Sequence, residues 1–509
     1  MPAPLAPLTL EIVVLLLGIV LLGFESFSKG GDRGWMARWS VAILSVVFAW
    51  SFFTTGDTGV DPSHAFYCAD PLALFFKRIA LLTTIIVMVI SLEFRPVLEK
   101  FIPGIQPGSG TGEFFALPVF TCAGLMFMAS AVDFLLIFVA LELVTISFYV
   151  LVAYMRRQNA SLEAGVKYLI LGALSTGFLV YGITWIFGLT GETNLARITQ
   201  VLPSLLAEGG RLHGSESALL FALMLLLIAL GFKVAAAPLQ FWVPDVYQGA
   251  PTPVTAFLSV GSKAAGFIVL ARVLQTVVFL PSIAPKVLSV LGLLAVLTLL
   301  YGNLAALPQD NLKRMLAYSS IGHAGYLLVA FASIDPAAGN LYRTQTAIGF
   351  YLFGYLLMTL LSFLVMTVVS RHSRGDDIVH FNGLSKRSPF LAFGMLIAML
   401  SLAGIPFTAG FYGKLLVFST AIARQNFLLV SVGIITVAAG FYFYLKVVSA
   451  MYWKEPTEDQ PVTASGLTKF TVAALCTAIF YFGIFPQSLL SMLPSDKAAP
   501  VAVSPAPHK

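Results

Sequence analysis

Long apolar runs, each close to the length of a membrane-spanning helix, recur along this chain of 509 residues. A hydrocarbon core of about 30 Å requires about 20 consecutive apolar residues per helix. Only 11% of the residues are charged, against roughly 25% in soluble domains. We therefore expect an all-α polytopic membrane protein. Its fourteen predicted transmembrane helices centre near Leu17, Ser45, Thr83, Cys122, Phe138, Leu174, Leu226, Ile268, Ala295, Gly322, Leu360, Gly404, Ile435 and Thr477.

The basic residues predict the orientation of these helices. Alternate connections between the apolar segments carry 15 of the 30 Lys and Arg, whereas the opposite connections and the C-terminal tail carry seven. By the positive-inside rule, the first set faces the cytoplasm or matrix. An even number of helices then places both termini on the outer side. The net charge of +6 is thus a topology signal, and we expect no nucleic-acid partner.

The cysteines and the N-terminus bear on processing and redox chemistry. Cys68, Cys122 and Cys476 show neither metal-ligand spacing nor a disulfide framework. We therefore expect no metal, no cofactor and no redox chemistry in this chain. The first apolar segment lacks a preceding basic region and a small-residue cleavage site, so we expect it to be retained as a helix.

Five basic residues lie inside apolar segments but near their ends. Lys167 and Lys446 are expected near the cytoplasmic face, and Lys77, Arg78 and Arg272 toward the outer face. Long basic side chains at such depths commonly reach the interface with their charged ends. We therefore expect these five to snorkel.

Four other ionisable residues are predicted near the middle of the bilayer. Counted from the expected helix ends at ~1.5 Å per residue, Glu142 and Lys263 lie about 13–15 Å deep, and His323 and Lys414 are similar. An ionisable group there costs at least ~2.5–3.5 kcal/mol unless it is paired or lines water. Each residue alone is also compatible with a structural ion pair or a packing role. A row of Lys, Glu and His is typical of a proton relay, because burial and pairing shift their protonation, and lysine, unlike arginine, can lose its proton.

Two apolar segments are interrupted by helix-breaking residues. They contain "GFKVAAAPLQFWVPD" (231–245) and "SLAGIPFTAGFYGK" (401–414). Proline removes a helical hydrogen bond, so both segments are predicted to be discontinuous helices, which the bilayer tolerates only beside protein or water. Lys233 precedes the first break and Lys414 follows the second. As the seventh and twelfth segments, they run in opposite directions, which an inverted five-helix repeat requires.

The depth of Lys233 does not match the depth of the other ionisable residues. Counted from Ser217, Lys233 lies ~24 Å along its helix, nearer the cytoplasmic face than the midplane. Either this helix begins outside the hydrocarbon, or its broken second part restores the depth of Lys233.

Three stretches carry a resemblance to a known family: "GFKVAAAPLQFWVPDVYQGAPTPVTAFLSVGSKAAG", "DNLKRMLAYSSIGHAGY" and "LAGIPFTAGFYGK". They resemble the antiporter-like membrane subunits of respiratory complex I, which are similar to subunits of multisubunit cation/proton antiporters. The resemblance spans residues 110–455. Within the family the N-type group is most similar, because the chain lacks the long lateral C-terminal helix of the L-type group and has Lys414 where the M-type group typically has glutamate.

The resemblance implies a domain organisation. It implies about fourteen transmembrane helices, with two inverted five-helix repeats and two discontinuous helices. Helices 1–3 would occupy residues 1–109, the first repeat residues 110–280, and the second repeat residues 281–455. Residues 456–509 would form the last helix and an outer tail.

The resemblance also implies a role for each buried ionisable residue. Glu142 matches the family's glutamate of helix 5, Lys233 the lysine of broken helix 7, Lys263 the lysine of helix 8, and Lys414 the lysine of broken helix 12. His323 falls in the helix 10 motif. Lys233, stabilised by Glu142, would carry the proton of the first half-channel, and Lys263 and His323 would pass it to Lys414.

The implied assembly is NADH:quinone oxidoreductase. Its NADH, FMN, iron–sulfur clusters and quinone would belong to partner subunits. Expected partners are the other complex I membrane subunits, especially the neighbouring antiporter-like subunit and the small membrane subunits, together with lipids. The expected location is the bacterial inner membrane or an equivalent energy-transducing membrane.

Two alternatives to this function stay open. One is a subunit of a cation/proton antiporter or membrane-bound hydrogenase, which shares the same motifs. The other is a structural scaffold in which buried charges only fix helix packing. An intramembrane enzyme is disfavoured, because the sequence shows no paired carboxylates, zinc-ligand spacing or nucleophile triad.

Overall fold

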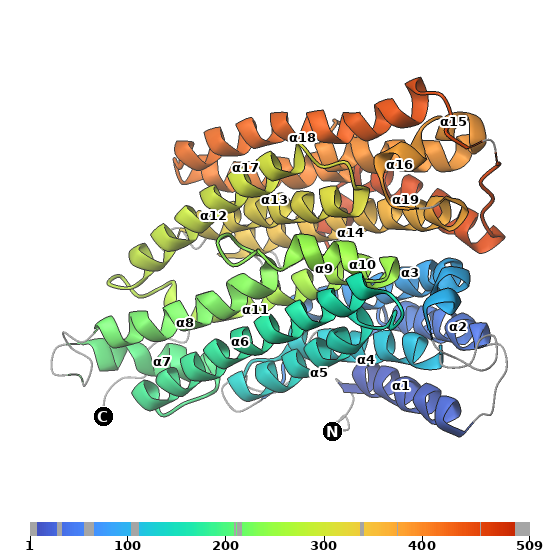
Figure 1. Cartoon of the computed structure of the whole chain (residues 1–509). Coiled ribbons are helices and arrows are strands. Elements are labelled where there is room, and N and C mark those ends of the chain that lie inside the picture. Colours follow the sequence, from blue (N-terminus) through green and yellow to red (C-terminus); the bar gives the residue numbers. More distant parts are fainter. Residues whose placement is uncertain are drawn as a thin grey trace.

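The described part of the chain is a bundle of long helices. A computed structural model describes residues 8–27, 33–54, 66–102, 111–207, 210, 216–335, 341–373, 375–458 and 460–493. Figure 1 shows the long helices lying side by side, with the first and second halves of the chain on opposite sides and α8 to α11 between them. No strand longer than an isolated bridge occurs within these ranges. The all-α fold class is confirmed.

The helices account for all fourteen predicted spans. Twelve helices in the described ranges are long and apolar enough to cross a membrane, counting α10 (Thr252–Phe257), the π-helical η3 (Leu258–Ser262) and α11 (Lys263–Val277) as one. The other eleven are α1 (Thr9–Phe27), α3 (Pro71–Phe101), α4 (Gly112–Ser130), α5 (Phe134–Val152), α6 (Asn159–Thr190), α8 (Glu216–Val234), α12 (Ala284–Ala306), α13 (Leu312–Ala332), α14 (Leu341–His372), α18 (Phe427–Trp453) and α19 (Gly466–Ile484).

Shorter helices complete the bundle and lie at the two remaining predicted segments. One segment is α2, and the other comprises the shorter apolar helices α16 and α17. The chain therefore is a multi-pass membrane protein. The shorter elements are α2 (Gly34–Trp50), α7 (Leu195–Leu206), α9 (Val243–Gly249), η4 (Ile378–Phe381), α15 (Leu384–Arg387), α16 (Pro389–Ala403), α17 (Ala409–Ala423) and α20 (Gln487–Leu490).

Polar side chains define where key helices begin. Asp133 caps α5 by accepting the Leu135 backbone N–H at 2.8 Å, and Asn311 caps α13 by accepting from Arg314 at 3.1 Å. Such caps satisfy backbone donors that the first helical turn leaves free. The predicted depths of Glu142 and His323 were counted from helix starts at Asp133 and Asn311, and these starts are therefore confirmed.

Both predicted helix breaks are present. After α8, Ala235 has a φ of 64° and the Ala237–Pro238 peptide is cis. The Ala237 N–H donates to Thr298 Oγ1 of α12 at 2.8 Å, so a side chain of the second half satisfies backbone freed by the first break. After α16, Gly404 and Phe407 have φ values of 91° and 69° before α17 begins. The π-helical segment η3 is a further interruption, which the sequence analysis did not predict.

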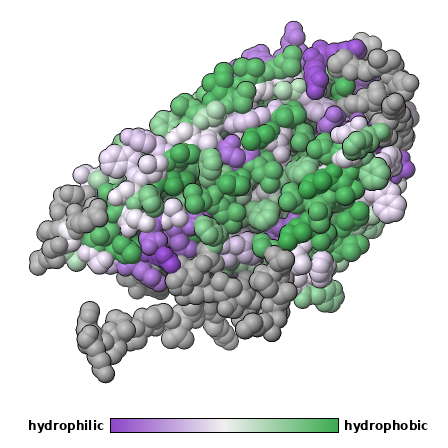
Figure 2. Space-filling view, turned by 90° about the horizontal axis from the view of Figure 1, so that it is seen from below, coloured by the Kyte–Doolittle hydropathy of each residue, from purple (hydrophilic) through white to green (hydrophobic). Residues whose placement is uncertain are grey.

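The surface agrees with a membrane setting. Leu293 and Ile435, from α12 and α18, are about 60% exposed, as expected for side chains that face hydrocarbon. Figure 2 shows one face on which hydrophobic residues cover most of the middle and hydrophilic residues gather mainly toward the two ends. The basic residues Lys29, Arg211, Arg374, Lys497 and Lys509, used in the topology prediction, lie outside the described residues, as do both chain ends.

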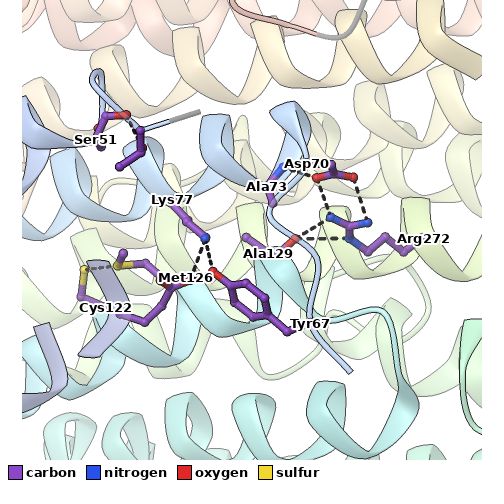
Figure 3. Close-up of polar contacts among 11 residues, drawn as sticks. Ser51, Tyr67, Asp70, Ala73, Lys77, Cys122, Met126, Ala129 and Arg272 are labelled. Atoms are coloured by element: carbon purple, nitrogen blue, oxygen red, sulfur yellow. Dashed lines mark hydrogen bonds and ion pairs between the residues drawn. The ribbon is translucent and has the colours of Figure 1, made fainter. Parts of the chain in front are cut away.

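The snorkelling prediction is wrong for Lys77 and Arg272. Lys77 is fully buried, with Nζ 2.8 Å from Glu11 Oε1, and it donates to the Tyr67 hydroxyl at 2.6 Å. Arg272 is 7% exposed and pairs with Asp70 across 3.0 Å (Figure 3). A paired and hydrogen-bonded charge tolerates burial, and the acidic partners lie on distant segments. These contacts tie α1, α3 and α11 together.

Candidate functional site

Lys233 and Glu142 are linked through hydroxyl groups. Lys233 is 5% exposed, and its ammonium donates to Thr145 Oγ1 at 2.8 Å. Thr145 lies one turn after Glu142 on α5, and Glu142 Oε1 accepts from Thr176 Oγ1 of α6 at 2.8 Å. Glu142 and Lys233 form no direct ion pair. The expected carboxylate–ammonium neighbourhood is therefore present, with threonines in between.

A small cavity joins the two threonines. Its volume is about 10 Å³, and its lining includes Thr145, Thr176, Ser175 and Lys233. This volume suits about one water molecule, and the polar lining supplies the partners that a buried water needs. The Glu142 side and the Lys233 side are thus connected by groups that can donate and accept hydrogen bonds.

Lys263 reaches from the first half of the chain into the second. It begins α11 directly after η3 and is 2% exposed. Its ammonium donates to the Ser320 carbonyl and to Ser320 Oγ of α13, both at 2.5 Å. π-helical segments are rare and often occur at functional sites. Here the π segment immediately precedes the residue that contacts α13.

Lys233 and Lys263 lie on neighbouring helices, but few direct contacts link their side chains. A Cβ added at Gly266, one turn after Lys263 on α11, would lie 3.4 Å from Lys233 Cγ. The two lysines therefore lie on adjoining helix faces. No hydrogen bond between described residues joins their ammonium groups.

His323 lies in a cluster of tyrosine hydroxyls. Its Nδ1 is 2.6 Å from the Tyr351 hydroxyl, and its Nε2 is 3.1 Å from the Tyr444 hydroxyl. Tyr444 also hydrogen-bonds Ser319 Oγ, the neighbour of Ser320. Which ring nitrogen donates depends on the tautomer. The hydroxyls extend the contacts of Lys263 toward His323.

Lys414 binds the carbonyl end of a broken helix. Its ammonium donates to the backbone oxygens of Leu402 and Ala403 at 2.9 and 2.8 Å. These belong to the last turn of α16, where helical carbonyls lack intrahelical partners and the helix dipole favours a cation. Lys414 is 7% exposed, and its ammonium lies 5.2 Å from the centre of the Tyr326 ring. Tyr326 in turn packs beside His323, with ring centres 6.0 Å apart.

The structure thus places the five predicted residues in one row, with Lys233, Lys263, His323 and Lys414 buried and Glu142 half-buried. The row runs from α5 through α8, α11 and α13 to α17. The sequence analysis missed Thr145, Ser320, Tyr351 and Tyr444, which hydrogen-bond Lys233, Lys263 and His323. Thr145 had one usable signal, its spacing of three from Glu142, which places both on one helix face. The described residues contain no group of three or more His, Cys, Asp or Glu positioned to hold a metal.

Comparison with known proteins identifies the family. The model of the NADH:quinone oxidoreductase/Mrp antiporter membrane family matches residues 131–440, more than half of the chain. The chain belongs to this family. Subunit N of NADH-quinone oxidoreductase from Heliobacterium modesticaldum is 40% identical over 95% of this chain and 96% of its own length. The same subunit from Trichlorobacter lovleyi is 39% identical over 94% of each chain.

Solved structures agree with the family assignment. A chain of respiratory complex I from Thermus thermophilus is 31% identical, with a TM-score of 0.76, and the match covers 95% of this chain and 98% of that one. A chain of the Mrp complex from a Dietzia species has a TM-score of 0.80 at 19% identity, covering 97% and 96%, and so shares the fold. The resemblance to antiporter-like subunits is confirmed, and the chain is 39–40% identical to subunit N of two bacteria.

Proposed function

We propose that this chain is a proton-translocating membrane-arm subunit of NADH-quinone oxidoreductase. Two findings support the proposal: the 40% identity to subunit N over almost the whole chain, and the buried row of ionisable residues. The row is the observation that carries the function, since charged groups at this depth are retained mainly along proton or ion paths. The chain would contribute proton transfer and no electron transfer.

The proton path would begin at Lys233 and end at Lys414. Glu142, Thr176 and Thr145 would hold the ammonium of Lys233 at the start. The proton would pass from Lys233 to Lys263, then along Ser320, Ser319 and Tyr444 to His323, and finally beside Tyr326 to Lys414. The ionisable residues of this path are Glu142, Lys233, Lys263, His323 and Lys414. Each hydroxyl both donates and accepts, so one proton can enter as another leaves.

The same proposal places the chain in a larger assembly and in a particular membrane. NADH oxidation at FMN, electron transfer through iron–sulfur clusters and quinone reduction would occur in other subunits. Its partners would be the neighbouring antiporter-like subunit, the small membrane subunits and lipids. It would reside in the inner membrane, with both termini outside. Residues 1–109, 110–280, 281–455 and 456–509 would form the initial helices, the two inverted repeats and the last helix with its tail.

The antiporter alternative has weaker support. The Mrp chain shares the fold, but its identity of 19% is about half of that to subunit N. Fold alone does not assign function. Sequence identity therefore favours the oxidoreductase subunit.

Proton uptake driven by NADH tests the proposal. Inverted membrane vesicles would be prepared from cells that lack this chain and are complemented with wild type, Glu142→Gln or Glu163→Gln. Glu163 is a matched control, because its carboxylate lies at the exposed start of α6 and pairs with Lys167. We expect Glu142→Gln, and not Glu163→Gln, to lower uptake per assembled complex. Normal NADH–quinone turnover in cells lacking the chain would contradict the proposal.

A further inference from the structure

A cleft lies apart from the charged row, between α12, α13 and the turn that joins α17 to α18. Its volume is about 790 Å³. Leu288 and Val296 of α12 and Leu429 of α18 form apolar walls, and Arg424 and Asn426 of the turn lie at its polar end. The cleft therefore has an apolar part and a hydrogen-bonding part.

The cleft exists because α12 and α13 diverge. At Gly302 a Cβ would lie 2.3 Å from the Gly322 backbone nitrogen, so the two helices touch backbone to backbone there. At Gly292, ten residues earlier, a Cβ would meet only the Ala332 Cβ, at 3.9 Å. Small side chains at the open end leave the space between the helices unfilled.

The surroundings of the cleft are typical of a surface in contact with lipid. Leu293 and Leu297 on α12 are 60% and 41% exposed, and Ile434 and Ile435 on α18 are 58% and 63% exposed. Leu293 itself lines the cleft, and the other three lie on the two helices that form its walls. The cleft is thus a recess in the membrane-facing surface.

The polar end carries donors for an anion. Arg424 is 45% exposed, and its Nη1 lies 3.2 Å from Asp335 Oδ1. A guanidinium has five N–H donors, so this contact leaves others for a second acceptor. The side-chain amides of Gln425 and Asn426 line the same end. Together they form a mouth rich in N–H donors beside an apolar recess.

We propose that this cleft binds a phospholipid with an anionic headgroup, whose acyl chain fills the recess and whose phosphate accepts from Arg424 and the adjoining amides. An α-helix about 10 Å wide fills about 400 Å³ per turn, so a neighbouring helix would place less than two turns in this space. A flexible chain with a charged head matches both the shape and the charge. The proposal is independent of proton transfer.

Photocrosslinking in the assembled complex tests the lipid site. The purified membrane complex would be reconstituted with phosphatidylglycerol bearing a diazirine in its acyl chain, or with the matching phosphatidylcholine, and crosslinked peptides would be identified by mass spectrometry. Gly292→Leu fills the recess, and Arg424→Gln removes the cation. Gly188→Leu is the matched control, because an exposed Gly188 on α6 has open space for a Cβ.

The expected outcome is specific to the cleft. Wild type and Gly188→Leu should crosslink phosphatidylglycerol at the cleft-facing residues of α12 and α18, and Gly292→Leu should lose most of this product. Arg424→Gln should reduce the preference for phosphatidylglycerol over phosphatidylcholine by about fivefold, as expected for one basic contact. Unchanged crosslinking in Gly292→Leu, no product in wild type, or shielding of the cleft by a peptide of another subunit would each overturn the proposal.

Discussion

Lys233 of α8 hydrogen-bonds Thr145 of α5 at 2.8 Å, and Thr145 lies one turn from Glu142 on the same helix face. Thr145 also donates its own proton to the Leu141 carbonyl at 2.6 Å, so its oxygen is free to accept from the ammonium. The Thr145 hydroxyl and a water-sized cavity thus lie between the Glu142 carboxylate and the Lys233 ammonium. This arrangement lets the charged state of Lys233 change without breaking a direct ion pair.

Thr145→Val should impair proton pumping while the complex still assembles. The valine removes the acceptor of the Lys233 ammonium, and a hydrogen bond to a charged group contributes about 1.5–3 kcal/mol. We expect NADH-driven proton uptake per assembled complex to fall severalfold. Thr121→Val is the control, because the buried Thr121 hydroxyl donates only to the Leu117 carbonyl and lies outside the row. Equal uptake in the two variants would remove Thr145 from the path.

Tyr444→Phe should slow proton transfer between Lys263 and Lys414. The substitution keeps the ring but deletes the hydroxyl that contacts both Ser319 and His323. A positioned proton-transfer group commonly contributes about 100-fold or more, so we expect at least about tenfold lower uptake. Tyr412→Phe serves as control, because it likewise removes only a hydroxyl, from a ring packed against Phe350. Wild-type pumping by Tyr444→Phe would show that protons bypass this hydroxyl.

Asp376→Asn should lower stability in a pH-dependent way. Burial raises the pKa of Asp376, but Lys313 and the Ser370 hydroxyl outweigh burial and hold the pKa below its usual range. Such a carboxylate contributes its full stability above its unfolded pKa and loses it as pH falls through the folded pKa. We expect a loss of about 1–3 kcal/mol at pH 7, measured by thermal melting of the complex. The gap between variant and wild type should close below roughly pH 4. A gap independent of pH would contradict the assignment.

Cysteine accessibility tests the proposed orientation. In a background with the native cysteines replaced, Arg157→Cys and Lys386→Cys should react with an impermeant maleimide only from the cytoplasmic side. Gln200→Cys should react only from the outer side. Arg157, Lys386 and Gln200 are exposed, so access does not depend on unfolding. The asymmetry of basic residues motivates this prediction, and labelling of all three from one side would overturn it.

Local sequence signals predicted much of the fold. Apolar length located twelve helices long enough to span a membrane and the shorter helices at the other two predicted segments, because the bilayer sets helix length. Proline and glycine located both breaks, since they disrupt the helix at their own positions. The five ionisable residues were found because a charge inside an apolar run is conspicuous.

The partners of those residues were harder to predict. Thr145 bonds its own helix at Leu141, as hydroxyl residues in helices commonly do, and nothing local indicates its second contact with Lys233. The same holds for Tyr444, 121 residues from His323. For Lys77, depth alone suggested snorkelling, whereas its environment is set by Glu11 of a different helix.

Proton uptake by Lys233 variants tests the central claim most directly. Uptake per NADH oxidised would be measured in reconstituted vesicles and normalised to assembled complex for wild type, Lys233→Ala and Lys233→Arg. We predict near-normal assembly and at least about tenfold lower uptake in both variants, because arginine keeps the charge but cannot release its proton. If Lys233→Arg pumps like wild type, or if Lys233→Ala loses uptake only in proportion to lost assembly, Lys233 is a structural charge and not a proton carrier.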